Sequence, residues 1–144
     1  MRLFFYGTLM QGTCNDFATA LHRRLEVGVP ATATGRLYAI PDPAGWYPAF
    51  IPDPAGAAVH GMVHAAGPGF AQADLAALDA YEDYRPADPA GSLYLRRPLT
   101  VSSAGEDIGA QAYIYNAVLP AGARPIACGD FRTFLAAHGL PEFR

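Results

Sequence analysis

The sequence has few cysteines, few charged residues and no basic run, and each shortage excludes a class of protein. Cys14 and Cys128 are the only cysteines, too few for a disulfide framework, so we expect free thiols in a reducing cytoplasm. Only 16% of the residues are charged, the net charge is -3, and no stretch is rich in Lys or Arg. Proteins that bind nucleic-acid phosphates usually carry a basic stripe, so we expect no nucleic-acid partner.

The sequence also lacks an apolar run long enough to cross a membrane. The first ten residues, MRLFFYGTLM, contain one Arg and a short apolar segment that ends at a glycine, without the small-residue cleavage site of a signal peptide. Hydrophobic residues make up 51% of the chain, which is enough for a substantial core. These features predict a cytoplasmic protein with a single domain over residues 1–144 and no contact with a membrane.

The pattern of apolar residues predicts a mixture of strands and helices. Strands are predicted at 2–6, 34–40, 59–65, 93–101 and 111–116, and Pro98 is expected to break the fourth or place it at an edge. Helices are predicted at 16–26, 70–81 and 130–138. The first helix has Asn15 or Thr13 as its cap, and Asp130 and Gly139 bound the last one. Because strands and helices do not alternate strictly, the pattern favours an α+β fold with a small barrel-like sheet and about three flanking helices.

The tetrapeptide DPAG occurs three times, at 42–45, 53–56 and 88–91. The spacings are unequal and the flanking residues differ, so this is no structural repeat. Asp at the first position, Pro at the second and Gly at the fourth are typical of a type I turn. We therefore predict three tight turns between extended segments.

One carboxylate of the second predicted helix falls on its apolar face. At about 100° per residue, Glu82 projects between Leu75 and Leu78, whereas Asp79 lies only partly on that side. A carboxylate held against a sheet loses water and its pKa rises, which suits a general acid/base. The alternative is that the helix ends near Ala80 and leaves Glu82 on the surface.

Other polar residues give weaker signals. In FFYGTLMQG (4–12), Gly7 permits a sharp turn whose amides are able to hold a carboxylate, although an ordinary strand-to-helix turn explains the same residues. His60 and His64 share a strand face but lie roughly 13 Å apart at strand rise, so we predict no metal site and no cofactor. Cys14 has no partner histidine and is interpreted as a bystander. Tyr113 and Tyr115 lie on one face of the last predicted strand, where they either face a pocket or belong to the core.

Several short segments together resemble the γ-glutamylcyclotransferase-like family, which includes the AIG2-like proteins. They occur in the family's order over nearly the whole chain. They are YGTLM (6–10), GRLY (35–38), YPAF (47–50), VHGMVH (59–64), LDAYEDY (78–84), AYIY (112–115) and GDFRTFL (129–135).

The resemblance implies a barrel-like α+β fold with a pocket beside the YGTL loop. In the family, amides of this loop hold the substrate's α-carboxylate, and the glutamate of the LDxYE segment is the acid/base. The matching positions are the substrate-binding residues Tyr6, Gly7, Thr8, Leu9 and Tyr113 and the catalytic Glu82. Asp83 stands where many members have glycine, so a second carboxylate beside Glu82 is expected to affect its pKa or the substrate preference.

The implied activity converts a small γ-glutamyl amine or peptide into 5-oxoproline and a free amine. Reaction within one bound molecule benefits from proximity and needs one acid/base, without a nucleophile, metal or cofactor. A second hypothesis is a binding module that recognises a carboxylate-bearing metabolite in the same pocket. A third, a structural protein, predicts an exposed Glu82 and no pocket near Gly7. The sequence specifies neither the leaving amine nor the oligomeric state.

Overall fold

The computed structural model describes residues 1–10, 12 and 15–144. The strands among these residues are β1 (Arg2–Phe5), β2 (Val29–Ile40), β3 (Tyr47–Pro52), β4 (Ala57–Ala65), β5 (Tyr94–Ser103), β6 (Glu106–Tyr115) and β7 (Arg124–Pro125). The helices are α1 (Asp16–His22), α2 (Gln72–Tyr81), the 3-10 helix η1 (Pro89–Gly91) and α3 (Phe131–His138). No described helix is long and apolar enough to cross a membrane.

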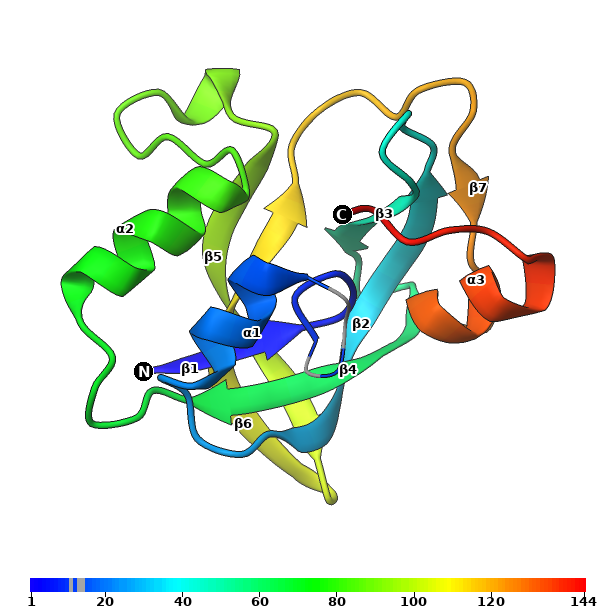
Figure 1. Cartoon of the computed structure of the whole chain (residues 1–144). Coiled ribbons are helices and arrows are strands. Elements are labelled where there is room, and N and C mark those ends of the chain that lie inside the picture. Colours follow the sequence, from blue (N-terminus) through cyan, green and yellow to red (C-terminus); the bar gives the residue numbers. More distant parts are fainter. Residues whose placement is uncertain (11, 13–14) are drawn as a thin grey trace.

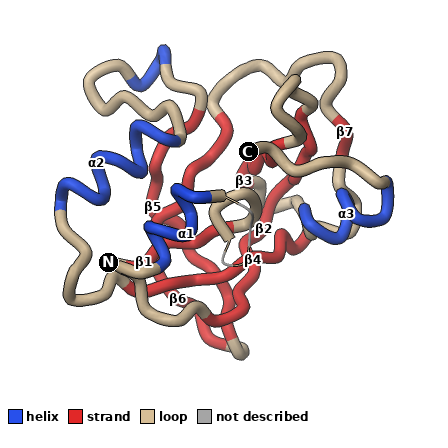
Figure 2. Tube along the Cα trace, viewed as in Figure 1, coloured by secondary structure: helices blue, strands red, loops and turns tan. Residues whose placement is uncertain are grey.

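Five strands close into a barrel in the order β2-β4-β1-β6-β5 (Figures 1 and 2). The ring closes where Thr32 of β2 pairs with Ser102 of β5. β1 and β6 run parallel, and the other pairs of the ring are antiparallel. β3 and β7 pair with the far end of β2 and extend the sheet beyond the ring. The α+β barrel-like fold expected from the sequence is confirmed.

β1 is buried on both faces because it lies between the barrel interior and the helical layer. Phe4 belongs to the apolar cluster inside the barrel, whereas Leu3 and Phe5 belong to a second cluster outside it. All three are at most 3% exposed, and burying each such side chain contributes roughly 1.5–3 kcal/mol to folding. The second cluster contains residues of α1 and α2, and α3 packs against the interior cluster. β1 therefore fixes the loop that follows it.

Three helix ends have the caps that the sequence predicts. Asn15 accepts a hydrogen bond from the N–H of Ala18, while the alternative cap Thr13 lies outside the described residues. Asp130 caps α3 through the N–H of Thr133, and Gly139 ends it with a left-handed backbone, φ 63°. α1 is shorter than predicted.

The strand predictions missed β3 and placed the starts of β2 and β6 five residues too late, whereas the edge position expected for Pro98 is confirmed. β5 continues through Pro98, which is tolerated because β5 pairs with β6 on one side and meets β2 only at Ser102. β3 was missed because Pro48 and Pro52 disfavour a strand, yet β3 is an edge strand with β2 as its only neighbour within the described chain. β2 begins at Val29, five residues earlier than predicted, because residues 29–35 pair with β4.

Two of the three DPAG segments form the predicted turn. The N–H of Gly45 donates to the carbonyl of Asp42, and the N–H of Gly56 donates to that of Asp53, each at 2.9 Å. The third segment was predicted wrongly, because it forms η1, with Asp88 as its cap, in the connection between α2 and β5.

Candidate functional site

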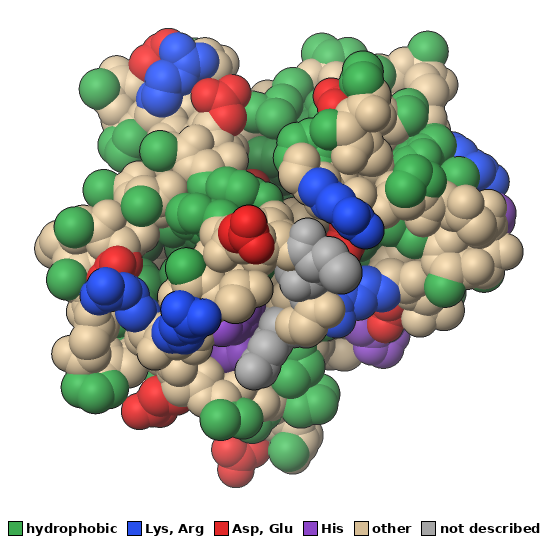
Figure 3. Space-filling model, in the orientation of Figure 1, with side chains coloured by type: hydrophobic (Ala, Val, Ile, Leu, Met, Phe, Trp, Pro, Cys, Tyr) green, Lys and Arg blue, Asp and Glu red, His purple; other side chains and the backbone are tan. Residues whose placement is uncertain are grey.

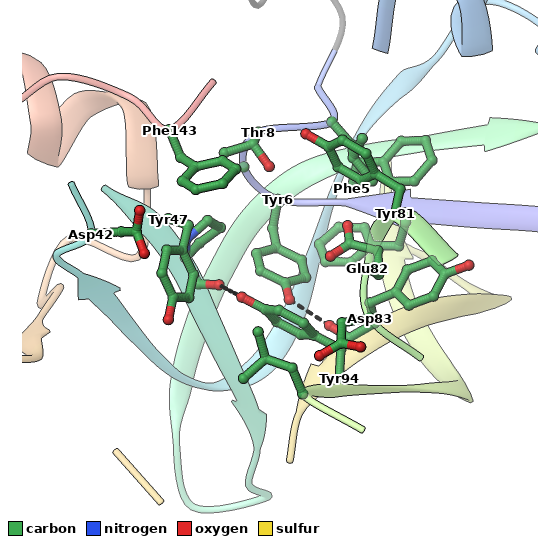
Figure 4. Close-up of a pocket in the computed structure, with 16 residues that line it drawn as sticks. Phe5, Tyr6, Thr8, Asp42, Tyr47, Tyr81, Glu82, Asp83, Tyr94 and Phe143 are labelled. Atoms are coloured by element: carbon green, nitrogen blue, oxygen red, sulfur yellow. Dashed lines mark hydrogen bonds between the residues drawn. The ribbon is translucent and has the colours of Figure 1, made fainter. Parts of the chain in front are cut away.

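A cavity of about 230 Å³ opens where the loop after β1 meets the end of α2 (Figure 4). The loop contributes Tyr6, Gly7, Thr8 and Leu9, and the end of α2 contributes Tyr81 and Glu82. Side chains from β3, β5, β6 and the carboxyl-terminal segment complete the wall. The cavity thus brings together all six residues that the sequence analysis selected, since Tyr113 of β6 also lines it.

The loop 6–10 is held in place by packing and by hydrogen bonds to its carbonyl groups. Gly7 packs so closely on the ring of Pro48 that a Cβ would overlap that ring. The carbonyl of Leu9 contacts Nε2 of His22 at 2.6 Å, and the carbonyl of Met10 accepts from Arg132 at 3.0 Å. These contacts come from three elements, so the loop is anchored on several sides.

The main-chain N–H groups of the same loop are free to receive a ligand. Among the described residues, no acceptor is found for the N–H of Gly7, Thr8 or Leu9. Unpaired amides in a turn beside a cavity form a site for an anion or a developing negative charge.

Glu82 is the C-cap residue of α2 and lines the cavity opposite the loop. Its N–H donates to the carbonyl of Leu78 at 3.1 Å, so the helical path continues to this residue although the helix itself ends at Tyr81. In the described part of the chain, its carboxyl makes neither an ion pair nor a hydrogen bond. Although the side chain is partly exposed to the cavity, protein surrounds it, and this desolvation raises its pKa to about 8.

The turn after Glu82 places Asp83 at a position with a left-handed backbone. The N–H of Asp83 donates to the carbonyl of Ala80 at 3.1 Å and the N–H of Tyr84 donates to that of Asp79 at 2.8 Å, which together form a Schellman motif. Asp83 has φ 51°, the left-handed conformation that favours glycine. Its carboxylate lies 3.7 Å from Nε of Arg85 at the surface. Burial is the cause of the raised pKa of Glu82, without a contribution from Asp83.

Asp79 was placed wrongly by the helical projection, which had it only partly toward the sheet. It is 6% exposed and accepts hydrogen bonds from Nε of Arg96 at 2.8 Å and from the hydroxyl of Tyr113 at 2.6 Å. Asp79 follows Leu75 by four residues, and this spacing could have predicted its burial because residues four apart lie on one face of a helix. The partners on β5 and β6 carry no such signal in the sequence.

The tyrosines around the cavity use their hydroxyls within the protein. Tyr6 donates to the carbonyl of Tyr113, and Tyr94 donates to the carbonyl of Pro48 at 2.5 Å (Figure 4). Tyr113 donates to Asp79, so its ring, and not its hydroxyl, is offered to the cavity. Burial raises the pKa of Tyr6, Tyr94 and Tyr113, and all three are neutral at physiological pH.

No group of three metal-ligating side chains occurs among the described residues. His64 is buried, and its Nδ1 lies 2.9 Å from the carbonyl oxygen of Glu26. His60, four residues earlier on β4, is exposed. Cys128 is an exposed thiol, and Cys14 lies outside the described residues.

A sequence model of the family described as "Gamma-glutamyl cyclotransferase, AIG2-like" matches residues 3–133. The chain belongs to this family. The match includes the loop after β1, the end of α2 and β6, which carry the cavity residues. No curated protein sequence matches the chain at the threshold applied.

Solved structures share the fold of this γ-glutamylcyclotransferase-like chain. An AIG2-like protein from Mus musculus superposes with a TM-score of 0.72 at 19% identity, over 99% of this chain and 95% of the mouse chain. YkqA from Bacillus subtilis superposes with a TM-score of 0.67 at 18% identity, over 96% of this chain but 42% of its own. Allophanate hydrolase from Kluyveromyces lactis superposes with a TM-score of 0.68 at 15% identity, over 95% of this chain and 21% of the hydrolase chain. The chain thus spans less than half of the length of the last two proteins, and these likenesses establish the fold alone.

Proposed function

We propose that the protein is a γ-glutamylcyclotransferase that converts a small γ-glutamyl amine or peptide into 5-oxoproline and a free amine, with Glu82 as general acid/base. The observation that carries the proposal is a desolvated carboxyl beside a loop that lines the same cavity, where neither the carboxyl nor the amides of residues 7–9 have a partner in the described part of the chain. Membership of the cyclotransferase family supports the general kind of reaction.

The pKa of Glu82 suits a group that must both take and give a proton. With a pKa of about 8, the carboxyl is mostly protonated at neutral pH but keeps an ionised fraction, so both forms are available for acid/base catalysis. An ordinary glutamate would be fully ionised there and would be a poor proton donor.

The reaction balances with this one group. The neutral α-amine nitrogen attacks the γ-carbonyl carbon to form a C–N bond and a tetrahedral oxyanion, and ionised Glu82 takes the proton that this nitrogen loses as the bond forms. The oxyanion collapses, the bond from the γ-carbon to the leaving nitrogen breaks, and Glu82 returns the proton to that nitrogen. The products are 5-oxoproline and the free amine, and Glu82 is ionised again.

The loop 6–9 supplies the complementary polar groups in this proposal. The N–H groups of Gly7, Thr8 and Leu9 bind either the α-carboxylate of the substrate or the developing oxyanion. The aromatic rings of Tyr6 and Tyr113 enclose the γ-glutamyl chain and exclude water from the carboxyl. At about 230 Å³ the cavity is smaller than the usual small-molecule site of roughly 300–1,000 Å³, which suits a group the size of glutamate.

The test is Glu82→Gln, assayed for release of 5-oxoproline from a panel of γ-glutamyl amines by mass spectrometry. The amide keeps the shape of the side chain but transfers no proton, so we expect turnover to fall by at least about 10²–10⁴-fold. Calorimetric affinity for a bound substrate is expected to change little. Glu106→Gln is the matched control, because Glu106 is exposed at the β5–β6 turn, outside the cavity.

Retained turnover in Glu82→Gln would overturn the assignment of this residue. Binding of panel members without product from the wild-type protein would instead favour a binding module for carboxylate-bearing metabolites. Loss of turnover in Glu106→Gln would show that the assay reports general damage to the fold.

A further inference from the structure

Glu82 has no partner among the described residues that holds its side chain, so its position depends on the main chain that carries it. Within the described chain its carboxyl makes no hydrogen bond or ion pair. Its residue is the C-cap of a ten-residue helix in which Leu75, Leu78 and Asp79 are the buried residues. Whatever fixes the last turn of α2 therefore sets the distance between Glu82 and the loop on the opposite wall.

Asp79 fixes that turn through both its main chain and its side chain. Its carbonyl accepts from the N–H of Tyr84 at 2.8 Å and so closes the Schellman motif that follows Glu82. Its carboxylate binds Arg96 on β5 and Tyr113 on β6. One residue thus joins the end of α2 to two adjacent strands of the barrel.

The same connections reach the loop on the other side of the cavity. Tyr113, whose hydroxyl donates to Asp79, accepts at its carbonyl a hydrogen bond from the hydroxyl of Tyr6. Tyr6 begins the loop that lines the cavity, in which the N–H groups of Gly7, Thr8 and Leu9 have no acceptor among the described residues. A continuous path of hydrogen bonds therefore runs from the loop through Tyr6, Tyr113 and Asp79 to the turn that carries Glu82.

We infer that Asp79 is a positioning residue, which holds Glu82 at its working distance from the loop amides by anchoring the end of α2 to Arg96 and Tyr113. This inference rests on the proposed function for the reaction it serves, but the placement of Glu82 is testable without turnover. Asp79 does not touch the cavity itself, since it is absent from the cavity wall.

The test compares Asp79→Asn with Tyr113→Phe and with the control Asp74→Asn. Asp79→Asn keeps the size of the side chain but loses the ion pair, and Tyr113→Phe removes one hydrogen bond while keeping the charge of Asp79. Asp74 lies on the first turn of the same helix, where its half-buried carboxylate is 3.4 Å from the exposed Arg24. It touches neither the cavity nor the last turn of α2.

Two readouts are measured for each variant: kcat and KM for 5-oxoproline release, and the titration of the Glu82 carboxyl by carbon-13 NMR. The groups around that carboxyl are Tyr6, Tyr81, Tyr94 and Tyr113, whose pKa values are all raised, so they do not titrate near pH 8. Burial also raises the pKa of Glu142, which interacts with Tyr81, so the Glu82 signal is assigned as the carboxyl resonance that is missing from Glu82→Gln.

For Asp79→Asn we expect kcat to fall about 10–100-fold with KM nearly unchanged, because a displacement of about 1 Å has an effect of this size. The Glu82 midpoint is expected to move down by about one pH unit or more as the carboxyl gains water. Tyr113→Phe is expected to change both readouts in the same direction by less, and Asp74→Asn to change neither.

A folded Asp79→Asn protein with the wild-type kcat and Glu82 midpoint would overturn the inference. If Asp79→Asn does not fold, Tyr113→Phe becomes the test. Wild-type kcat and a wild-type Glu82 midpoint in Tyr113→Phe would then overturn the inference. A wild-type protein that releases no 5-oxoproline would contradict the proposed function, while the NMR titration would still test the placement of Glu82.

Discussion

The two ends of α2 each carry an aspartate that contacts an arginine, but they differ in their access to water. At the first turn, Asp74 lies 3.4 Å from Arg24, with side-chain exposures of 22% and 55%. At the last turn, Asp79 lies 2.8 Å from Arg96, with exposures of 8% and 20%. An ion pair in water contributes little to stability, whereas a half-buried pair strongly favours the structure that keeps it intact.

Glu82 shows the third outcome for a carboxylate on this helix. It loses water like Asp79, but gains no cation and no hydrogen bond from the described residues, so its neutral form is favoured. Within nine positions, Asp74 thus caps the helix, Asp79 anchors its last turn, and Glu82 carries the proton in the proposed reaction. Burial and partners separate these roles, because all three side chains carry the same functional group. The surface of the molecule in the orientation of Figure 1 shows acidic side chains beside arginines at several places, as expected for ordinary surface pairs (Figure 3).

The largest expected effect concerns the pH dependence of stability, because Glu82→Gln should remove the part that Glu82 contributes. Below pH 4.5 Glu82 is protonated in both the folded and unfolded chain, and between 4.5 and about 8 only the folded chain binds the proton. Stability of the wild type relative to the variant should therefore fall by up to about 1.4 kcal/mol per pH unit across that window and become constant above it. Urea unfolding of both proteins across the window measures this difference. Parallel pH profiles would contradict a raised pKa in Glu82.

The next effect concerns the two aspartates directly. Asp79→Ala leaves Arg96, in a poorly hydrated position, without its carboxylate partner but with its hydrogen bond to Gln111, and should lower the free energy of unfolding by about 3 kcal/mol. Asp74→Ala removes a surface pair and a hydrogen bond to the N–H of Ala71, and should cost about 1 kcal/mol or less. Equal losses in chemical denaturation would remove the contrast between the two ends.

The smallest effect concerns Asp83, the residue at the left-handed position of the last turn. Asp83→Gly relieves the unfavourable backbone at φ 51° and should raise the free energy of unfolding by about 0.5–1 kcal/mol. The kcat should be retained, since Asp83 does not cause the raised pKa of Glu82, whereas the preference among amines is free to change because Asp83 lines the cavity. A decrease in stability would show that the pair with Arg85, 3.7 Å apart, is worth more than the backbone strain.

Local patterns in the sequence predict what local physics controls. β1, the caps of α3 and two tight turns follow from apolar runs, side-chain oxygens and glycines near one another in the chain. Projection along α2 also directs Glu82 toward the barrel, because the last helical hydrogen bond extends to that residue.

Long-range contacts explain what the sequence does not predict. Asp79 meets its partners 17 and 34 residues away, and nothing in the spacing links Arg96 or Tyr113 to that position. The edge location of β3, which permits Pro48 and Pro52, depends on the closed order of strands. The resemblance supplied the roles of Glu82 and of the YGTL loop, whereas Asp79 emerged from the fold.

The central claim is that Glu82 transfers the proton, and the pH dependence of kcat/KM tests it most directly, because this parameter reports ionisation in the free enzyme. With a γ-glutamyl amine and correction for the titration of the substrate, our account predicts a rate that rises with pH to a midpoint near 8, the pKa of Glu82. A midpoint near 4.5, the ordinary value for a glutamate, would contradict it.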